Sequence, residues 1–487
     1  MFANLAQRAR MRNGLCASLL LASAINSPAL CQTLVAGASP ANSPLPVSSS
    51  PVAQSQRSSR PNIILIMTDD MGAETVGAYG SEYATPMIDL LASQGMLFRN
   101  AHATPLCTPS RTRILTGIEN ARNYKAFGHL DPAARTFGHV LQDAGYHTAI
   151  VGKWQLSGNG FDGRIGMSPD KSGFDEALLW QVATGPARGS RYWGPTFWHN
   201  GRVVVNEYGF GPELANRFAI DFMKANRERP FFLYYPMVLP HSPYIPTPDD
   251  MAAEDEKSRF AAMVRYIDKM VGDLMDALDR EGLADNTVII FTGDNGTGRE
   301  ITTVRNGVSV RGGKGLATIA GTHVPMIVRW PGKIRPRSVS DALFDFMDVM
   351  PTLAEIGDTQ VNEVDGVSQV PVLVGKQQHV RDHIFMHYAP RWISQPARFV
   401  LDDKWKLYGD GRFVALDMNH GTETEIAKPS GEARKRLATF RKILDNAGDG
   451  PLDPTRFPMC AGRTSVKPGV SAEIAGCRRE EGDNSAD

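Results

Sequence analysis

Two pairs of oxygen-bearing side chains each follow a short apolar run in the sequence. Asp69 and Asp70 come one residue after the apolar residues 63–67, and Asp294 and Asn295 follow a second such run. Adjacent buried carboxylates repel each other and lose their hydration, which is costly unless a cation neutralises them. Four hard oxygen ligands favour Ca²⁺, with Mg²⁺ as a second candidate and Zn²⁺ disfavoured. The alternative is ordinary turn chemistry, in which Asp-Asp and Asp-Asn-Gly are common.

A cysteine in a polar, proline-containing segment is the second candidate for chemistry. Cys107 opens the sequence Cys-Thr-Pro-Ser-Arg-Thr-Arg, and Thr116 and Gly117 follow it. Its spacing to Arg113 satisfies the C-x₅-R pattern of cysteine phosphatases. However, Pro109 interrupts the segment, and no glycine opens a backbone cradle for phosphate. A buried structural cysteine is the other alternative.

The cysteine motif, taken together with both carboxylate pairs, resembles the signature of type I sulfatases. The motif matches that pattern at Cys107, Pro109, Arg111, Thr116 and Gly117. The resemblance implies an alkaline-phosphatase-like fold and the hydrolysis of sulfate esters. It also implies that a maturation enzyme oxidises the cysteine to formylglycine. The hydrated aldehyde then supplies the nucleophilic oxygen, and the aldehyde is regenerated when sulfate leaves.

Four cationic or titratable residues match further positions of the same family. By this resemblance, Arg111 stabilises the modified cysteine, while Lys153 and Lys314 bind sulfate oxygens. His241 contacts the sulfate or protonates the leaving alcohol. Cations around a dianionic transition state are sound electrostatics. The alternatives are a lysine that extends to solvent after an apolar strand and a histidine that is only structural.

Two positions depart from the family pattern. Gln155 stands where the family usually has a histidine that helps to eliminate sulfate, and His323 stands where arginine is common. A glutamine can hold a hydroxyl group of the substrate site but cannot accept a proton near neutral pH. We therefore assign Gln155 to substrate binding and leave open which base replaces the usual histidine.

Apolar runs that alternate with amphipathic segments predict an α/β fold with a mainly parallel sheet between helices. Further strands are expected at 148–151, 231–235, 288–291 and 326–330, and helices at 137–144, 213–225 and 256–281. The catalytic domain is predicted to span residues 61–375, which the resemblance also covers. Short strands and Gly-Asp turns beyond this point predict a smaller C-terminal antiparallel-sheet subdomain at 376–450.

The N-terminal segment carries the features of a targeting signal. Three arginines precede an apolar run at 15–25, which predicts a cleaved signal peptide over residues 1–31. A flexible linker rich in Ser, Pro and Ala is expected at 32–60. The protein is then exported to the periplasm or medium, with no integral membrane span after cleavage. A lipoprotein acylated at Cys31 is the weaker alternative.

Two further expectations come from the C-terminal tail and from the overall charge. Residues 451–487 are rich in Pro, Gly and charge, and an oxidising compartment would favour a disulfide between Cys460 and Cys477. Two free thiols are the alternative. Lys plus Arg and Asp plus Glu both number 52, so the balance gives no indication of a nucleic-acid partner.

Together these inferences predict an exported, Ca²⁺-dependent sulfuric ester hydrolase. A sulfated glycan is favoured over another sulfated small molecule, because several aromatic side chains could stack on sugar rings: Trp154, Trp180, Tyr192, Trp193 and Trp198. Two alternatives stay open. The same scaffold could hydrolyse phosphate or phosphonate monoesters, or Gln155 could mark a non-catalytic binder of sulfated glycans.

Overall fold

A computed structural model describes residues 60–158, 164–390 and 397–447, together with two short strands, β18 (Ser465–Val466) and β19 (Arg478–Arg479). The predicted α/β class is confirmed, because a large, mainly parallel sheet and a separate small antiparallel sheet are present. The predicted signal peptide, almost all of the linker and the Cys460–Cys477 pair lie outside the described residues. The predicted domain boundaries stay predictions.

The central sheet has ten strands in the order β12-β2-β11-β8-β1-β7-β3-β4-β5-β6. Neighbours from β8 to β4 run parallel, whereas β11 runs antiparallel to both β8 and β2. The strands are β1 (Asn62–Thr68), β2 (Met96–His102), β3 (His147–Lys153), β4 (Glu176–Trp180), β5 (Thr196–His199), β6 (Arg202–Val205), β7 (Phe231–Pro236), β8 (Thr287–Gly293), β11 (Met326–Arg329) and β12 (Ser338–Asp345). A separate hairpin pairs β9 (Thr302–Arg305) with β10 (Val308–Arg311).

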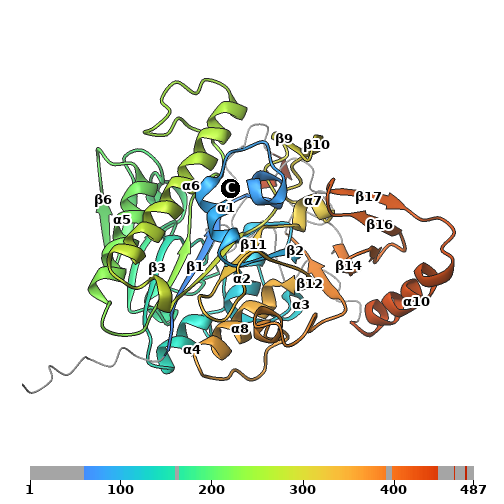
Figure 1. Cartoon of the computed structure of the whole chain (residues 1–487). Helices are drawn as coiled ribbons and strands as arrows, with labels where there is room; N and C mark the ends of the chain where they lie inside the picture. The colour runs from blue at the N-terminus through green and yellow to red at the C-terminus, as the bar shows by residue number, and fades with distance from the viewer. Residues whose placement is uncertain (1–59, 159–163, 391–396, 448–464, 467–477, 480–487) are drawn as a thin grey trace, which may run out of the picture. The chain divides into compact units, whose positions relative to one another are not determined.

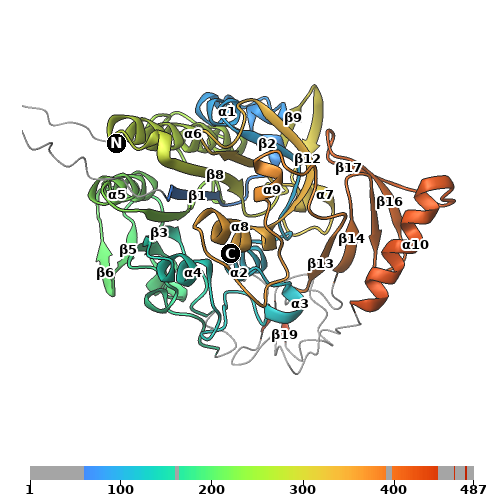
Figure 2. The same cartoon turned by 60° about the horizontal axis from the view of Figure 1, so that its bottom comes forward.

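Helices cover both faces of this sheet (Figures 1 and 2). On one face lie α1 (Pro86–Ser93), α5 (Gly211–Ala225) and α6 (Glu256–Arg280). On the other lie α2 (Cys107–Thr116), α4 (Phe137–Asp143) and α8 (Val349–Ile356). Shorter helices are α3 (Asn120–Asn123), α7 (Ile319–Thr322) and α9 (Val370–Leu373). The helices predicted at 137–144, 213–225 and 256–281 are thus present, with ends shifted by one or two residues.

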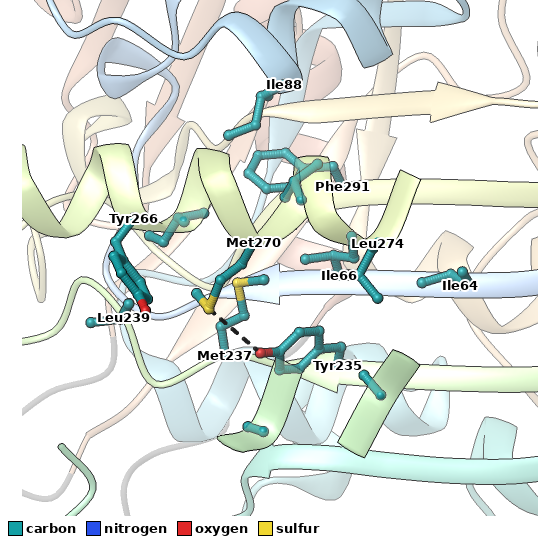
Figure 3. Close-up of a cluster of buried hydrophobic side chains, with 14 of the residues drawn as sticks. Ile64, Ile66, Ile88, Tyr235, Met237, Leu239, Tyr266, Met270, Leu274 and Phe291 are labelled. Atoms are coloured by element: carbon teal, nitrogen blue, oxygen red, sulfur yellow. Dashed lines mark hydrogen bonds between the residues drawn. The ribbon is translucent and has the colours of Figure 1, made fainter. Parts of the chain in front are cut away.

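The continuous apolar run of β1 is explained by its burial on both faces. Ile64 and Ile66 face the cluster beneath α6, whereas Ile63, Leu65 and Met67 face the opposite cluster. Figure 3 shows Ile64 and Ile66 beside α6, whose Met270 accepts a hydrogen bond from the Tyr235 hydroxyl on β7. Every residue of β1 is buried, so the position of its C-terminal end is held by packing on two sides.

The C-terminal sheet is a five-stranded antiparallel meander in the order β13-β14-β15-β16-β17. Its strands are β13 (Ile384–Tyr388), β14 (Ala397–Leu401), β15 (Trp405–Tyr408), β16 (Phe413–Asp417) and β17 (Thr422–Glu425). One face packs against Leu343 of β12 and against Ala317, and α10 (Gly431–Asn446) covers the other face. The short antiparallel strands that the sequence predicted for this region are thus present. Among the described helices, none combines the length and apolar character that crossing a membrane requires.

Candidate active site

The predicted site residues lie where strands of the central sheet end. Asp69 and Asp70 follow β1, and Asp294 and Asn295 follow β8. Thr68 pairs with Gly293 in the parallel register of these two strands, so both polar pairs leave the sheet side by side. Lys153 is the last residue of β3, and His241 lies in the segment after β7. This edge is where open α/β sheets bind ligands.

The two carboxylate pairs form one buried cluster. The Asp70 amide donates to Asp294 Oδ1 (3.0 Å), and Asn295 Nδ2 donates to Asp70 Oδ1 (2.8 Å). Asp70 adopts a left-handed backbone conformation, with φ of 68°, which Asp tolerates better than most residues. Asn295 Oδ1 is buried and has no hydrogen-bond partner among the described residues. An unpaired amide oxygen beside three carboxylates fits a hard divalent cation.

A histidine extends this candidate metal centre. Ligand atoms of Asp69, Asp70 and His241 all lie within 4.8 Å of one another. The sequence analysis predicted four oxygen ligands and assigned the histidine to the substrate. Asp294 and Asn295 are joined to this group through their hydrogen bonds with Asp70, and only the oxygen ligands match Ca²⁺ or Mg²⁺ preferences.

Each carboxylate of the cluster is paired with a cation. Lys153 Nζ lies 2.9 Å from both oxygens of Asp69, and Lys314 Nζ lies 2.7 Å from Asp70 Oδ2. Arg111 Nη2 donates to Asp294 Oδ2 at 2.9 Å. Lys153 and Lys314, which were predicted to bind sulfate, thus bond to Asp69 and Asp70, which were predicted to bind the metal. The predicted sulfate-binding and metal-binding residues therefore lie in one site.

The three carboxylates do not share this compensation equally. Burial raises the pKa of Asp69, but the charges of Lys153 and Arg111 outweigh it, so that pKa lies below its ordinary value. Burial and the neighbouring Asp69 charge raise the pKa of Asp294 to about 7. Burial also raises the pKa of Asp70. Burial therefore disfavours the charged forms of Asp70 and Asp294 despite their paired cations, and a further cation bound beside them would favour those charged forms.

Cys107 is the first residue of α2 and is only 2% exposed. It packs against Leu106 and against Tyr388 of the C-terminal sheet. Burial raises the pKa of its thiol, with Asp294 and Asp69 adding to the effect and Lys153 opposing it. A thiol mechanism needs a thiolate, so this environment argues against the cysteine-phosphatase alternative.

Gln155 lies next to the cysteine helix. Thr108 Oγ1 donates to Gln155 Oε1 (3.3 Å), so the carbonyl end of the amide is occupied. Gln155 Nε2 is buried and has no partner among the described residues, and the residue has a positive φ of 64°. The amide NH₂ is therefore the group free to donate to an oxygen. This geometry is compatible with the predicted substrate contact and provides no base.

The His241 ring is surrounded by polar groups on both of its nitrogens. Nδ1 lies 2.6 Å from the Ser242 carbonyl, which can only accept, and 2.9 Å from Arg191 Nη2, which can only donate. Nε2 lies 3.1 Å from Lys314 Nζ, which can only donate. Burial, together with the Lys314 and Arg191 charges, holds the pKa of His241 well below its ordinary value. The side chain is therefore neutral here, and it would have to gain a proton before it could protonate a leaving alcohol.

Arg191 is a site residue that the sequence analysis missed. Its buried guanidinium lies 2.9 Å from His241 Nδ1 and also donates to the Ser242 carbonyl. It stacks on Trp180 and Tyr192, with ring centroids 4.8 and 4.9 Å from its central carbon. Arg191 lies in a segment between β4 and β5 without a recognisable motif, so no sequence signal pointed to it.

The predicted sugar-stacking aromatics require a correction. Trp154, Trp180 and Tyr192 are buried in the clusters on the two faces of the sheet, so they cannot stack on a ligand. Trp193 is 42% exposed and remains available. His323, the second departure from the family pattern, is also buried, and its Nε2 lies 2.8 Å from the Arg99 carbonyl.

A mainly parallel sheet with a buried carboxylate cluster at its strand ends defines the class, an α/β protein with a candidate cation site at that edge. Comparison with known proteins identifies the family. The family model described as sulfatase matches residues 61–359, and that described as N-sulphoglucosamine sulphohydrolase, C-terminal, matches residues 318–409. The chain belongs to the sulfatase family and is a sulfuric ester hydrolase.

Curated relatives span much of the chain. An N-acetylgalactosamine-6-O-sulfatase of Bacteroides thetaiotaomicron is 31% identical over 68% of this chain and 79% of its own length. The steryl-sulfatase of Rattus norvegicus is 30% identical over 69% of this chain and 74% of its own length. The family prediction is thereby confirmed.

Solved structures share the fold. A Bacteroides thetaiotaomicron protein of a locus for glycosaminoglycan metabolism is 25% identical, with a TM-score of 0.65, over 80% of this chain and 99% of its own. The phosphonate monoester hydrolase of Agrobacterium radiobacter aligns with a TM-score of 0.60 at 19% identity, over 79% of this chain and 95% of its own. The second likeness is one of fold alone.

Proposed function

We propose that this sulfatase hydrolyses sulfate esters of carbohydrates through a formylglycine derived from Cys107. The carbohydrate assignment is supported by the N-acetylgalactosamine-6-O-sulfatase among its relatives and by the neighbour from a glycosaminoglycan locus. A steryl-sulfatase relative makes a non-sugar ester the outcome to test against. The exposed Trp193 is the aromatic surface that a sugar ring could contact.

The observation that carries the chemistry is the convergence of Cys107 with a buried cluster of carboxylates and cations. Cys107 opens α2, and Arg111 of the same helix donates to Asp294 Oδ2 at 2.9 Å and to the Lys153 carbonyl at 3.2 Å, which holds the start of the helix against the cluster. A nucleophile, a cation site and anion-binding lysines within one electrostatic environment are the parts that transfer of a sulfuryl group requires.

The oxygen-rich cluster would hold Ca²⁺, with Mg²⁺ as the second candidate. Asp69, Asp70, Asp294 and Asn295 are the proposed ligands, and Asn295 Oδ1 is the ligand atom that lacks any other partner. When bound, the ion would supply positive charge that acidifies the nucleophilic hydroxyl and stabilises the transition state.

The remaining steps, which are sulfate binding and proton transfer, would depend on side chains of the site. Lys153 and Lys314 would hold sulfate oxygens, while Arg111 would keep Asp294 oriented through its 2.9 Å hydrogen bond. Gln155 would donate its free NH₂ to a hydroxyl or sulfate oxygen, and His241 would contact the sulfate or, after gaining a proton, donate it to the leaving alcohol oxygen.

The decisive experiment combines mass spectrometry with a substrate panel. Peptide mass at Cys107, measured on protein from its native cell, should show conversion of the thiol to the aldehyde. Sulfate release should then be measured on sulfated sugars, a sulfated steroid, an aryl sulfate and the matching phosphate esters. Turnover of the steroid or aryl ester alone would reject the carbohydrate proposal, and an unmodified cysteine in active protein would reject the formylglycine.

We also propose that the signal peptide at residues 1–31 directs the protein out of the cytoplasm and that a maturation enzyme of the host converts Cys107. Support comes from the charged and apolar pattern of the N-terminal segment. N-terminal sequencing of the protein from periplasm and medium should find a start near residue 32. A full-length chain confined to the cytoplasm would contradict the proposal.

A further inference from the structure

The segment that carries Lys314 is built from residues that do not hold a conformation by themselves. Lys314 lies in the sequence Gly312-Gly313-Lys314-Gly315, between β10 and α7, and Gly315 has a φ of 81°. Glycine loses more backbone freedom on ordering than any other residue. The position of the Lys314 ammonium therefore depends on contacts that hold this lysine segment (residues 312–318) from outside.

Only part of that restraint comes from the catalytic sheet. The Lys314 amide donates to the Thr297 carbonyl at 2.9 Å, and the Gly315 amide donates to the Pro105 carbonyl at 2.7 Å. Both contacts lie at the start of the segment. The Leu316 amide donates back to the Gly313 carbonyl, whereas Ala317 and Ile319 bond to the C-terminal sheet, which lies beside α7 in Figure 1.

Three side chains of the C-terminal sheet make these later contacts. The Ala317 carbonyl accepts hydrogen bonds from Lys406 Nζ and from the Tyr408 hydroxyl (3.2 Å for the latter). The Ile319 amide donates to Glu423 Oε1 at 2.8 Å. A carbonyl and an amide two residues apart are therefore held by β15 and β17.

The three side chains also bind each other. Lys406 Nζ lies 3.1 Å from Glu423 Oε1, and the Tyr408 hydroxyl donates to Glu423 Oε2 at 2.5 Å. The lysine is fully buried, and its Nζ lies 4.0 and 4.4 Å from the ring centroids of Phe399 and Tyr408. Lys406, Tyr408 and Glu423 are hereafter the anchor cluster.

A gain in stability alone does not explain why Lys406 and Glu423 form a buried ion pair beneath the lysine segment. Removing two charges from water costs several kcal/mol per ion, which the attraction between them often fails to offset, and a well-packed apolar pair is frequently as stable. The neighbours Phe399, Leu401 and Val414 would suit an apolar side chain at position 406. What an apolar side chain could not do is bond the Ala317 carbonyl.

We propose that the anchor cluster of the C-terminal sheet positions the Lys314 ammonium in the active site by holding the Ala317 carbonyl and the Ile319 amide. Lys406, Tyr408 and Glu423 are positioning residues, since their contacts are with the lysine segment rather than with the proposed substrate. The inference rests on the proposed role of Lys314 as a sulfate-binding group. It assigns the C-terminal sheet a part in the affinity for the sulfate group.

The test uses the full-length, matured enzyme and three variants, Lys406→Met, Tyr408→Phe and Glu423→Gln. The measured quantities are kcat/KM for a sulfate ester and the inhibition constant of inorganic sulfate. A displacement of about 1 Å can lower catalysis on the order of a hundredfold, so we expect losses of about tenfold or more in kcat/KM. The inhibition constant should rise by about the same factor, because the same ammonium binds both ligands.

The inhibition constant distinguishes positioning from simple damage to the fold. It is a property of the folded molecules, so a smaller folded fraction leaves it unchanged. Leu407→Ala is the matched control, because Leu407 lies on the same strand between Lys406 and Tyr408 but packs on the opposite face with α10. It should lower the Tm without changing the inhibition constant. Tyr408→Phe removes a single hydroxyl group and keeps the test usable if the charge variants fail to fold.

Lys314→Ala separates the two proposals. If it retains full activity and sulfate affinity, the proposed role of Lys314 is wrong. If it loses both while all folded anchor variants keep the wild-type inhibition constant, the positioning proposal alone is wrong. An equal shift in Leu407→Ala would also overturn the positioning proposal. Support requires that Lys406→Met, added to Lys314→Ala, causes no further loss of sulfate affinity.

Discussion

Two arginines of helix α2, Arg111 and Arg113, enter two different buried ionic clusters. Arg113 uses all three of its nitrogen groups, donating to Asp345 (2.8 and 2.7 Å), Glu119 (3.0 Å) and the Phe385 carbonyl (2.9 Å). Arg111 donates to Asp294 and to the Lys153 carbonyl, but its Nε is buried without a partner. The two side chains are similar in burial and differ in how completely they are bonded.

The same contrast holds for the clusters as a whole. The structural cluster comprises Arg113, Glu119, Asp345, Asp348 and Arg381, and no buried side-chain atom of these residues lacks a hydrogen-bond partner. In the active site, Arg111 Nε, Gln155 Nε2 and Asn295 Oδ1 all lack one. Buried charge is therefore common to both clusters, and among the described residues the active-site cluster alone of the two leaves hydrogen-bonding atoms of its own members unpaired.

The largest effect is expected from removing the proposed nucleophile. Cys107→Ala should lower kcat about 10⁴-fold or more, because no other side chain of the site can form the covalent intermediate. The Tm should change little, since the variant removes one small side-chain atom that packs against Leu106 and Tyr388. Sulfate release by the variant at more than a few per cent of the wild-type rate would contradict the assignment.

Metal removal should affect the active-site cluster and leave the structural cluster intact. Treatment with a chelator should lower kcat/KM on the order of a hundredfold or more and lower the Tm, because a ligand that binds only the folded state stabilises it. Ca²⁺ should restore both quantities. Asp294→Asn should lower the affinity for Ca²⁺, whereas Asp345→Asn should leave it unchanged. Loss of Ca²⁺ affinity in Asp345→Asn alone would show that the metal binds elsewhere.

Breaking the structural cluster should damage stability rather than chemistry. Arg113→Met removes the nearest cation of Asp345 and Glu119, leaving Arg381 at 3.9 Å from Asp345, and breaking such a buried pair typically costs about 3–5 kcal/mol. Denaturant unfolding should show this decrease, while Ca²⁺ affinity and KM of the folded enzyme should remain near wild type. A large rise in KM at unchanged stability would show that Arg113 belongs functionally to the active site.

The anchor cluster predicts a pH dependence of stability. Burial lowers the pKa of Lys406 to about 8, with the Arg412 charge adding and Glu423 opposing, against an ordinary value of 10.5. Between pH 8 and 10.5 the unfolded chain therefore binds more protons at this group, so its contribution to stability rises with pH by about 3 kcal/mol. The Tm of wild type relative to Lys406→Met should increase over this range. His102 and Tyr408 also face Lys406, so the difference between the two proteins is the quantity to compare.

The smallest effect should come from restoring the family's usual residue at position 155. Gln155→His places a group that can accept a proton beside Thr108, which we expect to raise kcat a few-fold above pH 7, within the range of general base catalysis. A burst of product followed by slow turnover in wild type, absent in the variant, would locate the benefit in sulfate release. No change in kcat would indicate that another base already serves this step.

Much of the fold could be predicted because apolar runs and helical periodicity reflect burial directly. β1 and β8 are buried on both faces, and α6 has one apolar stripe. By contrast, all four residues of β6 are exposed, including its three valines. Its apolar residues therefore do not reflect burial, and the sequence pattern could not predict this strand. Helix α2 is polar in sequence, yet all ten of its residues are buried. Its arginines find partners on distant strands, which single-sequence reasoning cannot anticipate.

The candidate site shows the same division. Residues directly after apolar strands, such as Asp69 and Asp294, were predictable because strand ends of a parallel sheet share one edge. Arg191, Tyr388 and the anchor cluster reach the site through contacts between segments far apart in sequence. Their sequence neighbourhoods carry no motif, and only the folded arrangement of the two sheets reveals them.

The burial of Cys107 has a consequence for how the enzyme is produced. A side chain that is 2% exposed, at the start of a helix whose residues are all buried, cannot enter the active site of another enzyme once the chain has folded. The proposed oxidation must therefore take place while this segment is still extended. Folding and modification then compete for the same chain, so a host that folds the protein faster than it oxidises the cysteine will accumulate well-folded, inactive molecules.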